Sequence, residues 1–332
     1  MLMLSKRVFV YSVAFQIAMI SLVPTTSPGQ TQNSRAASSG SYLERGNSWV
    51  AKGELDRAIA DFDLAIATDS SSAAAYYNRG AARYLKRDLD GALADFDRAI
   101  QLNHRLIQAY VDRAAVRYSR GDLDGVIADN TRAIELDPRL AQAWNNRGLA
   151  RMDKGDLNGA LADFDRTLDL NPKRAETWGN RGTARSLKGD LEGAIDDYSR
   201  AIKLNPRFAE AWSERGVGRH RKGDLDGALA DHNRAIELNP TAASAYFNRG
   251  LAWRDKGDFA RTIADCDQAI ALNPDYAEAY AQRGLVRLQQ GKDAEAEKDF
   301  ARCLELKPEM QASLTRRIKE LKGQAGAWRA NC

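Results

Sequence analysis

The sequence predicts an all-α solenoid of eight 34-residue helix-turn-helix repeats. Its main evidence is that an Arg followed by Gly or Ala recurs every 34 residues, at Arg45, Arg79, Arg113, Arg147, Arg181, Arg215, Arg249 and Arg283. A fixed period of about 20–50 residues is typical of stacked arrays. The expected repeats are residues 39–72, 73–106, 107–140, 141–174, 175–208, 209–242, 243–276 and 277–310.

The N-terminal segment has a different character. Residues 1–29 place two basic residues before the uncharged stretch 8–23, and small, turn-rich residues follow up to Gly29. This order predicts a signal peptide, and the alternative is an uncleaved membrane anchor. The uncharged stretch is short for a membrane span, which needs about 20 apolar residues. The polar residues 30–38 predict a flexible linker. We therefore expect an exported protein, periplasmic or otherwise extracytoplasmic.

The fourth repeat, residues 141–174, shows how one hairpin is built. Gly155 is expected to end the first helix, because glycine readily adopts the left-handed conformation found just past a helix. Asp156 is expected to cap the second helix. That helix is predicted by the 3-and-4 spacing of Leu157, Ala160, Leu161, Phe164 and Leu168. Pro172 then stops it.

These hairpins resemble the tetratricopeptide repeat, whose signature combines a large aromatic residue, a Gly, a later Ala and aromatic residue, and a closing Pro. The first aromatic position holds Tyr42, Tyr76, Tyr110, Trp144, Trp178, Trp212, Tyr246 and Tyr280. The second holds an aromatic residue except at Asn130, His232 and Cys266. The resemblance implies a right-handed superhelix. An amphipathic pattern after residue 308 predicts a capping helix and tail over residues 311–332.

Two charged positions depart from the family pattern together. Arg precedes the small residue in all eight copies, and Asp precedes the second aromatic position in all eight. We interpret the two positions as an internal Arg–Asp ladder between the paired helices, for example Arg147 with Asp163 and Arg181 with Asp197. Such pairs can fix register without adding much stability, so the ladder is expected to be structural.

Composition and motifs argue against several functional classes. The 49 basic and 45 acidic residues give a net charge of +4, too nearly balanced for nucleic-acid binding. The three His and three Cys have no metal-ligand spacing, and no nucleotide-binding or nucleophile motif occurs. We therefore expect no metal, no cofactor and no enzymatic activity. Cys266 and Cys303 are expected to be buried thiols, whereas the terminal Cys332 could be reactive.

The resemblance implies that the first helices line a concave groove that holds a peptide or partner protein. The candidate partner-binding side chains are Tyr77, Tyr84, Tyr118, His220, Arg221, Phe247 and Arg254. A series of amides could bind an extended backbone, because an amide both donates and accepts: Asn78, Asn146, Asn180 and Asn248. The alternatives are solvated amides and tyrosines used for packing between repeats.

The sequence thus predicts a non-enzymatic protein–protein interaction scaffold, exported or tethered to a membrane through residues 8–23. One alternative is a membrane-anchored assembly factor for an envelope complex. Another is a non-catalytic accessory subunit of a separate enzyme. A groove that captures a glycan or lipid is also compatible with the sequence.

Overall fold

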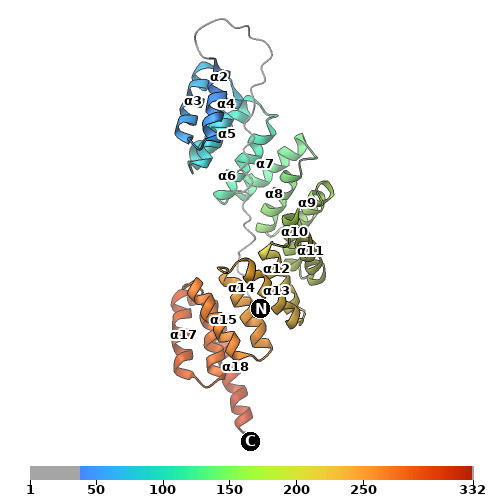
Figure 1. Cartoon of the computed structure of the whole chain (residues 1–332), viewed down its shortest axis with the longest axis vertical. Coiled ribbons are helices and arrows are strands. Elements are labelled where there is room, and N and C mark those ends of the chain that lie inside the picture. The colour runs from blue at the N-terminus through green and yellow to red at the C-terminus, as the bar shows by residue number, and fades with distance from the viewer. Residues whose placement is uncertain (1–37, 331–332) are drawn as a thin grey trace. The chain divides into compact units, whose positions relative to one another are not determined.

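A computed structural model describes residues 38–330 of the chain, with side chains described up to residue 323 (Figure 1). The predicted signal peptide or anchor at residues 1–29 and the terminal Cys332 lie outside the described residues. Within the described part there are 17 α-helices, one short 3-10 helix and no strand. The all-α architecture of consecutive helical hairpins, predicted from the 34-residue period, is confirmed.

Each hairpin consists of a first and a second helix. The first helices are α2 (Ser39–Ala51), α4 (Ala73–Leu85), α6 (Ile107–Ser119), α8 (Ala141–Asp153), α10 (Ala175–Lys188), α12 (Ala209–Arg221), α14 (Ala243–Asp255) and α16 (Ala277–Gln289). The second helices are α3 (Leu55–Thr68), α5 (Leu89–Leu102), α7 (Leu123–Leu136), α9 (Leu157–Leu170), α11 (Leu191–Leu204), α13 (Leu225–Leu238), α15 (Phe259–Leu272) and α17 (Asp293–Leu306). A 3-10 turn, η2 (Pro308–Met310), leads into the final helix α18 (Gln311–Ala330).

The helices fall into two compact units, and the boundary lies within α10, between Ala184 and Arg185. The first unit contains α2 to α9 and most of α10. The second contains the end of α10 and α11 to α18. Each unit is described by itself below.

The turn within each hairpin follows the local sequence. Gly155 has a φ of +86°, a conformation that costs glycine little, and it ends α8 as expected. The side chain of Asp156 then caps α9 by accepting a hydrogen bond from the Gly159 amide at 2.9 Å. Arg87 takes the glycine's place in the second hairpin, with a φ of +68°. This conformation is strained for a residue with a side chain.

In repeats 1, 2, 4, 6 and 8 the glycine of the first helix makes room for a ring on the second helix. A Cβ atom at Gly148 would lie 2.7 Å from Cε1 of Phe164, which is fully buried. The third repeat, which departs from this pattern, has Ala114 in place of the glycine and Asn130 in place of the ring. Asn130 is fully buried and donates a hydrogen bond to the Val126 carbonyl at 2.9 Å. The two departures compensate in size, because a smaller side chain on one helix accommodates a larger one on the other.

The repeated Arg joins three structural elements, as the fourth repeat shows. Arg147 donates from Nε and Nη2 to the two oxygens of Asp163, at 3.0 and 2.8 Å. Its third nitrogen, Nη1, donates to Thr131 on the preceding second helix at 3.0 Å. The guanidinium also lies over the Trp144 ring, 4.8 Å from its centroid. A further arginine, Arg151, reaches Asp163 at 2.8 Å. The Arg therefore fixes both the hairpin and its register on the previous repeat.

The same bidentate pairing occurs elsewhere in each unit, at Arg45–Asp61, Arg79–Asp95, Arg113–Asp129, Arg215–Asp231, Arg249–Asp265 and Arg283–Asp299. In the first unit, Arg181 contacts Asp165 at 2.6 Å and lies over Trp178. In the second unit, Asp197 pairs with Arg185 at 2.8 Å. Within a low-dielectric interior these charges stabilise only as pairs, because an unpaired buried charge is costly.

Candidate binding face

The first helices of neighbouring repeats are linked to each other by side-chain hydrogen bonds. In the first unit, the Tyr77 hydroxyl donates to Asp112 at 2.6 Å, and the Tyr118 hydroxyl donates to Asp153 at 2.7 Å. In the second unit, Nε2 of His220 lies 2.7 Å from a carboxylate oxygen of Asp255. We call the side of each unit that carries these bonds the first-helix face. Because its bonds run from repeat to repeat, this face is held in place before any partner arrives.

Four of the candidate partner-binding residues are buried, which corrects the expectation that they lie on an open surface. Tyr77, Asn78, Asn146 and Asn180 are each at most 5% exposed. The physical reason is that these positions lie where one first helix packs on the next. Asn78 donates to Asn47 of the preceding first helix at 2.9 Å, and the Tyr77 ring packs against Phe96, 5.7 Å between centroids. An amide series cannot meet a peptide backbone while it is buried in this way.

The remaining candidates are at least partly accessible. Tyr84, Tyr118, His220, Phe247, Asn248 and Arg254 are half-buried, and Arg221 is exposed. Tyr84 packs against Ala115 of the next repeat, and Tyr118 packs against a cluster that includes Ala150 of the next repeat, which is the inter-repeat packing considered as the alternative. The Phe247 ring lies 5.0 Å from the Tyr276 ring. Arg221 donates to Ser186 at 3.2 Å. These residues therefore hold repeats together, and their accessible edges contribute to the first-helix face.

Two carboxyl groups on first helices were not singled out by the sequence reasoning. Burial raises the pKa of Asp112 to about 6, although hydrogen bonds from Tyr77 and Gln108 oppose the shift. Burial also raises the pKa of Glu214 to about 7. Both occupy the register of the Asn series, where acidic residues replace the amide. The register itself was visible in the sequence, but the burial that shifts the pKa was not.

Two exposed leucines lie on the first-helix face, at another position of the 34-residue repeat. Leu85 and Leu187 are each 40% exposed, and they lie on the first helices α4 and α10. Asp153 and Asp255 occupy the same position in their own repeats. Their carboxylates take part in the inter-repeat bonds described above. Leu187 was not among the residues expected to bind a partner.

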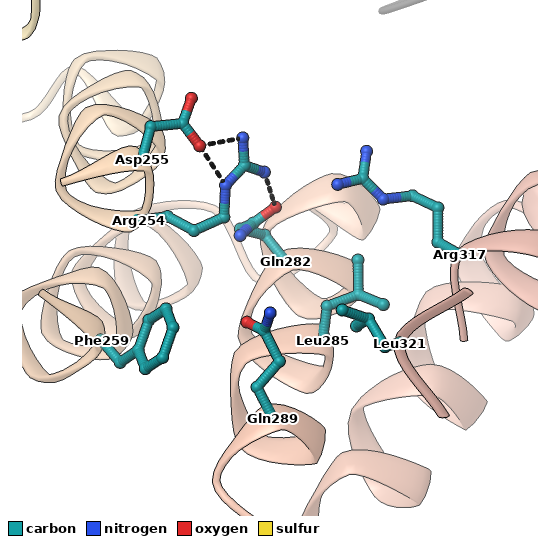
Figure 2. A pocket seen from close by; sticks show the side chains of 8 residues that line it. All are labelled: Arg254, Asp255, Phe259, Gln282, Leu285, Gln289, Arg317 and Leu321. Atoms are coloured by element: carbon teal, nitrogen blue, oxygen red, sulfur yellow. Dashed lines mark hydrogen bonds and ion pairs between the residues drawn. The ribbon is translucent and has the colours of Figure 1, made fainter. Parts of the chain in front are cut away.

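A pocket of about 260 Å³ opens in the second unit, between α14, α15, α16 and α18 (Figure 2). Among the predicted residues, Arg254 is the one that lines it. Its guanidinium donates to Asp255 on one side and to Gln282 on the other. Partial burial would raise the pKa of Asp255, but hydrogen bonds from His220 and Arg254 outweigh it and lower that pKa.

Two features are absent from the described residues. No group of three or more His, Cys, Asp or Glu side chains there is arranged to hold a metal ion. None of the described helices combines the length and the apolar character that crossing a membrane requires. Cys266 and Cys303 are buried free thiols, in agreement with the sequence-based expectation.

Comparisons with known proteins agree with this geometry. Family models described as tetratricopeptide repeat or TPR repeat match residues 46–86, 73–106, 141–174, 175–208, 218–257 and 249–322. A sequence comparison with curated proteins gives no match.

Among solved structures, a tetratricopeptide repeat protein from Parabacteroides merdae is 19% identical with a TM-score of 0.61, over 76% of this chain and 99% of that one. The APC/C hetero-tetramer Cut9-Hcn1 gives a TM-score of 0.61 at 15% identity, over 85% of this chain and 56% of that one. YrrB, described as a TPR protein with an unusual peptide-binding site, is 26% identical over 55% of this chain and 95% of its own, with a TM-score of 0.46. The first two likenesses show the fold.

The family matches and the helical hairpins lead to the same assignment. The matched segments extend over both units. In each hairpin the guanidinium of the repeated Arg lies over the ring of the first aromatic residue, from Tyr42 in α2 to Tyr280 in α16. The small residue and the closing turn lie at the positions that the family signature requires. The chain belongs to the tetratricopeptide repeat family.

Proposed function

We propose that this protein is a non-enzymatic interaction scaffold that binds a peptide or partner protein on the first-helix face. The observation that carries the proposal is the set of hydrogen bonds between successive first helices, such as Tyr77 to Asp112 and His220 to Asp255. A face whose side chains are already ordered loses less conformational entropy on binding than a mobile one. Stacked repeats also provide extended surfaces of the kind that such ligands need.

The composition of the face supports a protein ligand. Leu85 and Leu187 present apolar surface to solvent, and the first helices also carry half-buried aromatic rings such as Tyr84 and Phe247. Aromatic residues are enriched at protein interfaces, and charged groups around them favour specificity. A partner that lies across several first helices would contact these side chains in more than one repeat.

The test uses a photoreactive residue, p-benzoylphenylalanine, placed at matched positions of the full chain expressed in its own organism. Positions 85 and 187 lie on first helices, and positions 64 and 204 lie on second helices. All four positions hold leucines with similar exposure, 40% for the first pair and 44% and 42% for the second. We expect a partner protein to be cross-linked at position 85 or 187. The same protein should not be cross-linked at position 64 or 204. Equal cross-linking at all four positions would contradict the proposal.

We further propose that the scaffold acts outside the cytoplasm or on a membrane, with residues 8–23 as the export signal or tether. The support is the order of basic, uncharged and small residues at the start of the sequence. Mass spectrometry of the mature protein from soluble and membrane fractions would identify its N-terminus. An intact N-terminus in the soluble cytoplasmic fraction would refute this setting.

A further inference from the structure

The final helix, α18, differs in charge from the repeats that it follows. Residues 38–310 hold 41 basic and 44 acidic residues, whereas residues 311–330 hold five basic residues and one acidic residue. The positive charge of the described part of the chain is therefore concentrated in its last helix. We propose that α18 binds the surface of an anionic lipid bilayer. This inference goes beyond the proposed function, because it concerns a second surface of the protein and a different kind of partner.

One side of α18 attaches the helix to the second unit. Leu314 is 4% exposed, and Ile318 and Leu321 are half-buried. All three pack into a core cluster that includes Phe300 of α17. Their spacing, four residues and then three, places them on the same side of the helix. The attachment leaves the opposite side of α18 clear of the core.

The other sides of α18 carry its positive charges, and Arg316, Arg317, Lys319 and Lys322 are all exposed. Successive residues of an α-helix are rotated by about 100°. Arg316 and Lys319 therefore lie about 200° and 140° around the helix from Leu314, on the side opposite the core. Arg317 and Lys322 flank them. The four charges fall within about 9 Å along the helix axis, at about 1.5 Å per residue.

The protein does not neutralise these four charges. None of the four side chains has an ion pair or a hydrogen bond within the part of the chain whose side chains are described. The repeated arginines differ in this respect, since Arg147, for example, is paired with Asp163. Glu320 is the single acidic residue in the sequence of α18. A compact group of unpaired, exposed cations creates a positive potential that attracts an anionic surface within about a Debye length.

The distribution of charge favours a lipid surface over a nucleic acid. A nucleic acid long enough to bind tightly would extend over the neighbouring repeats, where acidic residues outnumber basic ones. A bilayer can be contacted by a terminal helix alone. In Figure 1 the end of α18 projects beyond α14 to α17, the helices of the same unit. Groups of four to eight Lys and Arg on an amphipathic helix are typical of binding to anionic lipids.

The start of the sequence offers a second attachment to the same membrane. Each Lys or Arg close to an anionic surface strengthens binding about fivefold, and stable association generally takes two signals. The uncharged stretch 8–23, proposed above as an export signal or tether, would supply the other signal if it is retained. The binding of α18 itself does not depend on that stretch.

The experiment measures co-sedimentation of the full chain with lipid vesicles. One set of vesicles contains phosphatidylcholine alone, and the other also contains about one-third phosphatidylglycerol, which is anionic. We expect tighter binding to the anionic vesicles and a smaller preference at higher salt, because the charges on α18 are exposed. Equal binding to both sets would overturn the proposal.

Variants assign the preference to α18. Arg316→Gln combined with Lys319→Gln should reduce the preference for anionic over neutral vesicles about 25-fold, or about fivefold for each charge removed. The matched control, Lys203→Gln combined with Arg207→Gln, removes the same two residue types from exposed positions of the second unit outside α18. It should leave the preference unchanged. The stretch 8–23 is the same in all these chains, so its own binding cancels in the comparison. An equal preference in both double variants would reject the proposal.

The outcomes also separate this inference from the proposed function. Cross-links at positions 85 and 187, with no difference between the two double variants, would reject binding by α18 alone. A preference that depends on α18, without those cross-links, would reject the scaffold face alone. Loss of an acidic protein from a pull-down with the α18 variant, while its vesicle preference persists, would show a protein partner and overturn the proposal. All four replaced residues are exposed, so both double variants should keep the original melting temperature.

Discussion

The fit between the small residue and the facing ring predicts opposite effects for the same substitution in two repeats. At Gly148 an added Cβ would lie 2.7 Å from Cε1 of Phe164, well inside an ordinary contact. At Gly250 the corresponding neighbour is Sγ of Cys266, at 3.9 Å. Both sites share a second contact, to a Cβ atom of Asp163 or Asp265 at 3.2 Å. The comparison between them therefore isolates the effect of the ring.

The magnitudes follow from two opposing terms. Alanine in place of glycine within a helix stabilises by about 0.5–1 kcal/mol. Overpacking a buried ring costs about 1–3 kcal/mol. Gly148→Ala should therefore lower the free energy of unfolding by about 0.5–2 kcal/mol. Gly250→Ala should leave it unchanged or raise it by up to about 1 kcal/mol.

The assay is urea unfolding of the full chain followed by circular dichroism, with each variant compared to the unaltered protein. A second-site change tests the cause directly. Phe164→Cys copies the seventh repeat, and in that background Gly148→Ala should lose most of its cost, which appears as a coupling energy in a double-mutant cycle. Equal losses at Gly148 and Gly250, or no coupling with Phe164, would refute the steric argument.

Three further changes test other parts of the structure. Asp163→Ala should destabilise by about 3–5 kcal/mol, because it leaves the buried Arg147 without its carboxylate, while the exposed Asp169→Ala should have little effect; unfolding midpoints measure both. Burial lowers the pKa of His232 to about 3, so between pH 6.5 and 3 only the unfolded chain takes up that proton and stability falls by about 1.4 kcal/mol per pH unit. His232→Phe should remove that dependence, which unfolding at pH 7 and pH 5 would detect, and an unchanged slope would contradict it. Arg87→Gly should stabilise by about 1 kcal/mol, because it relieves the positive φ, and a lower melting temperature would disprove this.

The sequence by itself determined the helical hairpins and their turns. Gly155 and the capping Asp156 are local signals that act within a few residues of where they stand, and the 34-residue period shows that such signals recur along the chain. The 3-and-4 spacing of apolar residues likewise predicted which side of each helix is buried. These features need no knowledge of how the repeats stack.

Only the tertiary structure decided which residues of the first helices are accessible. Tyr77 and Asn146 carry the same polar signal in the sequence as a surface residue, yet both side chains are buried. The pocket is equally non-local, because Phe259 and Arg317 meet there from helices far apart in the chain. Burial between repeats depends on the distance between helices, and a repeating pattern within one helix does not encode that distance.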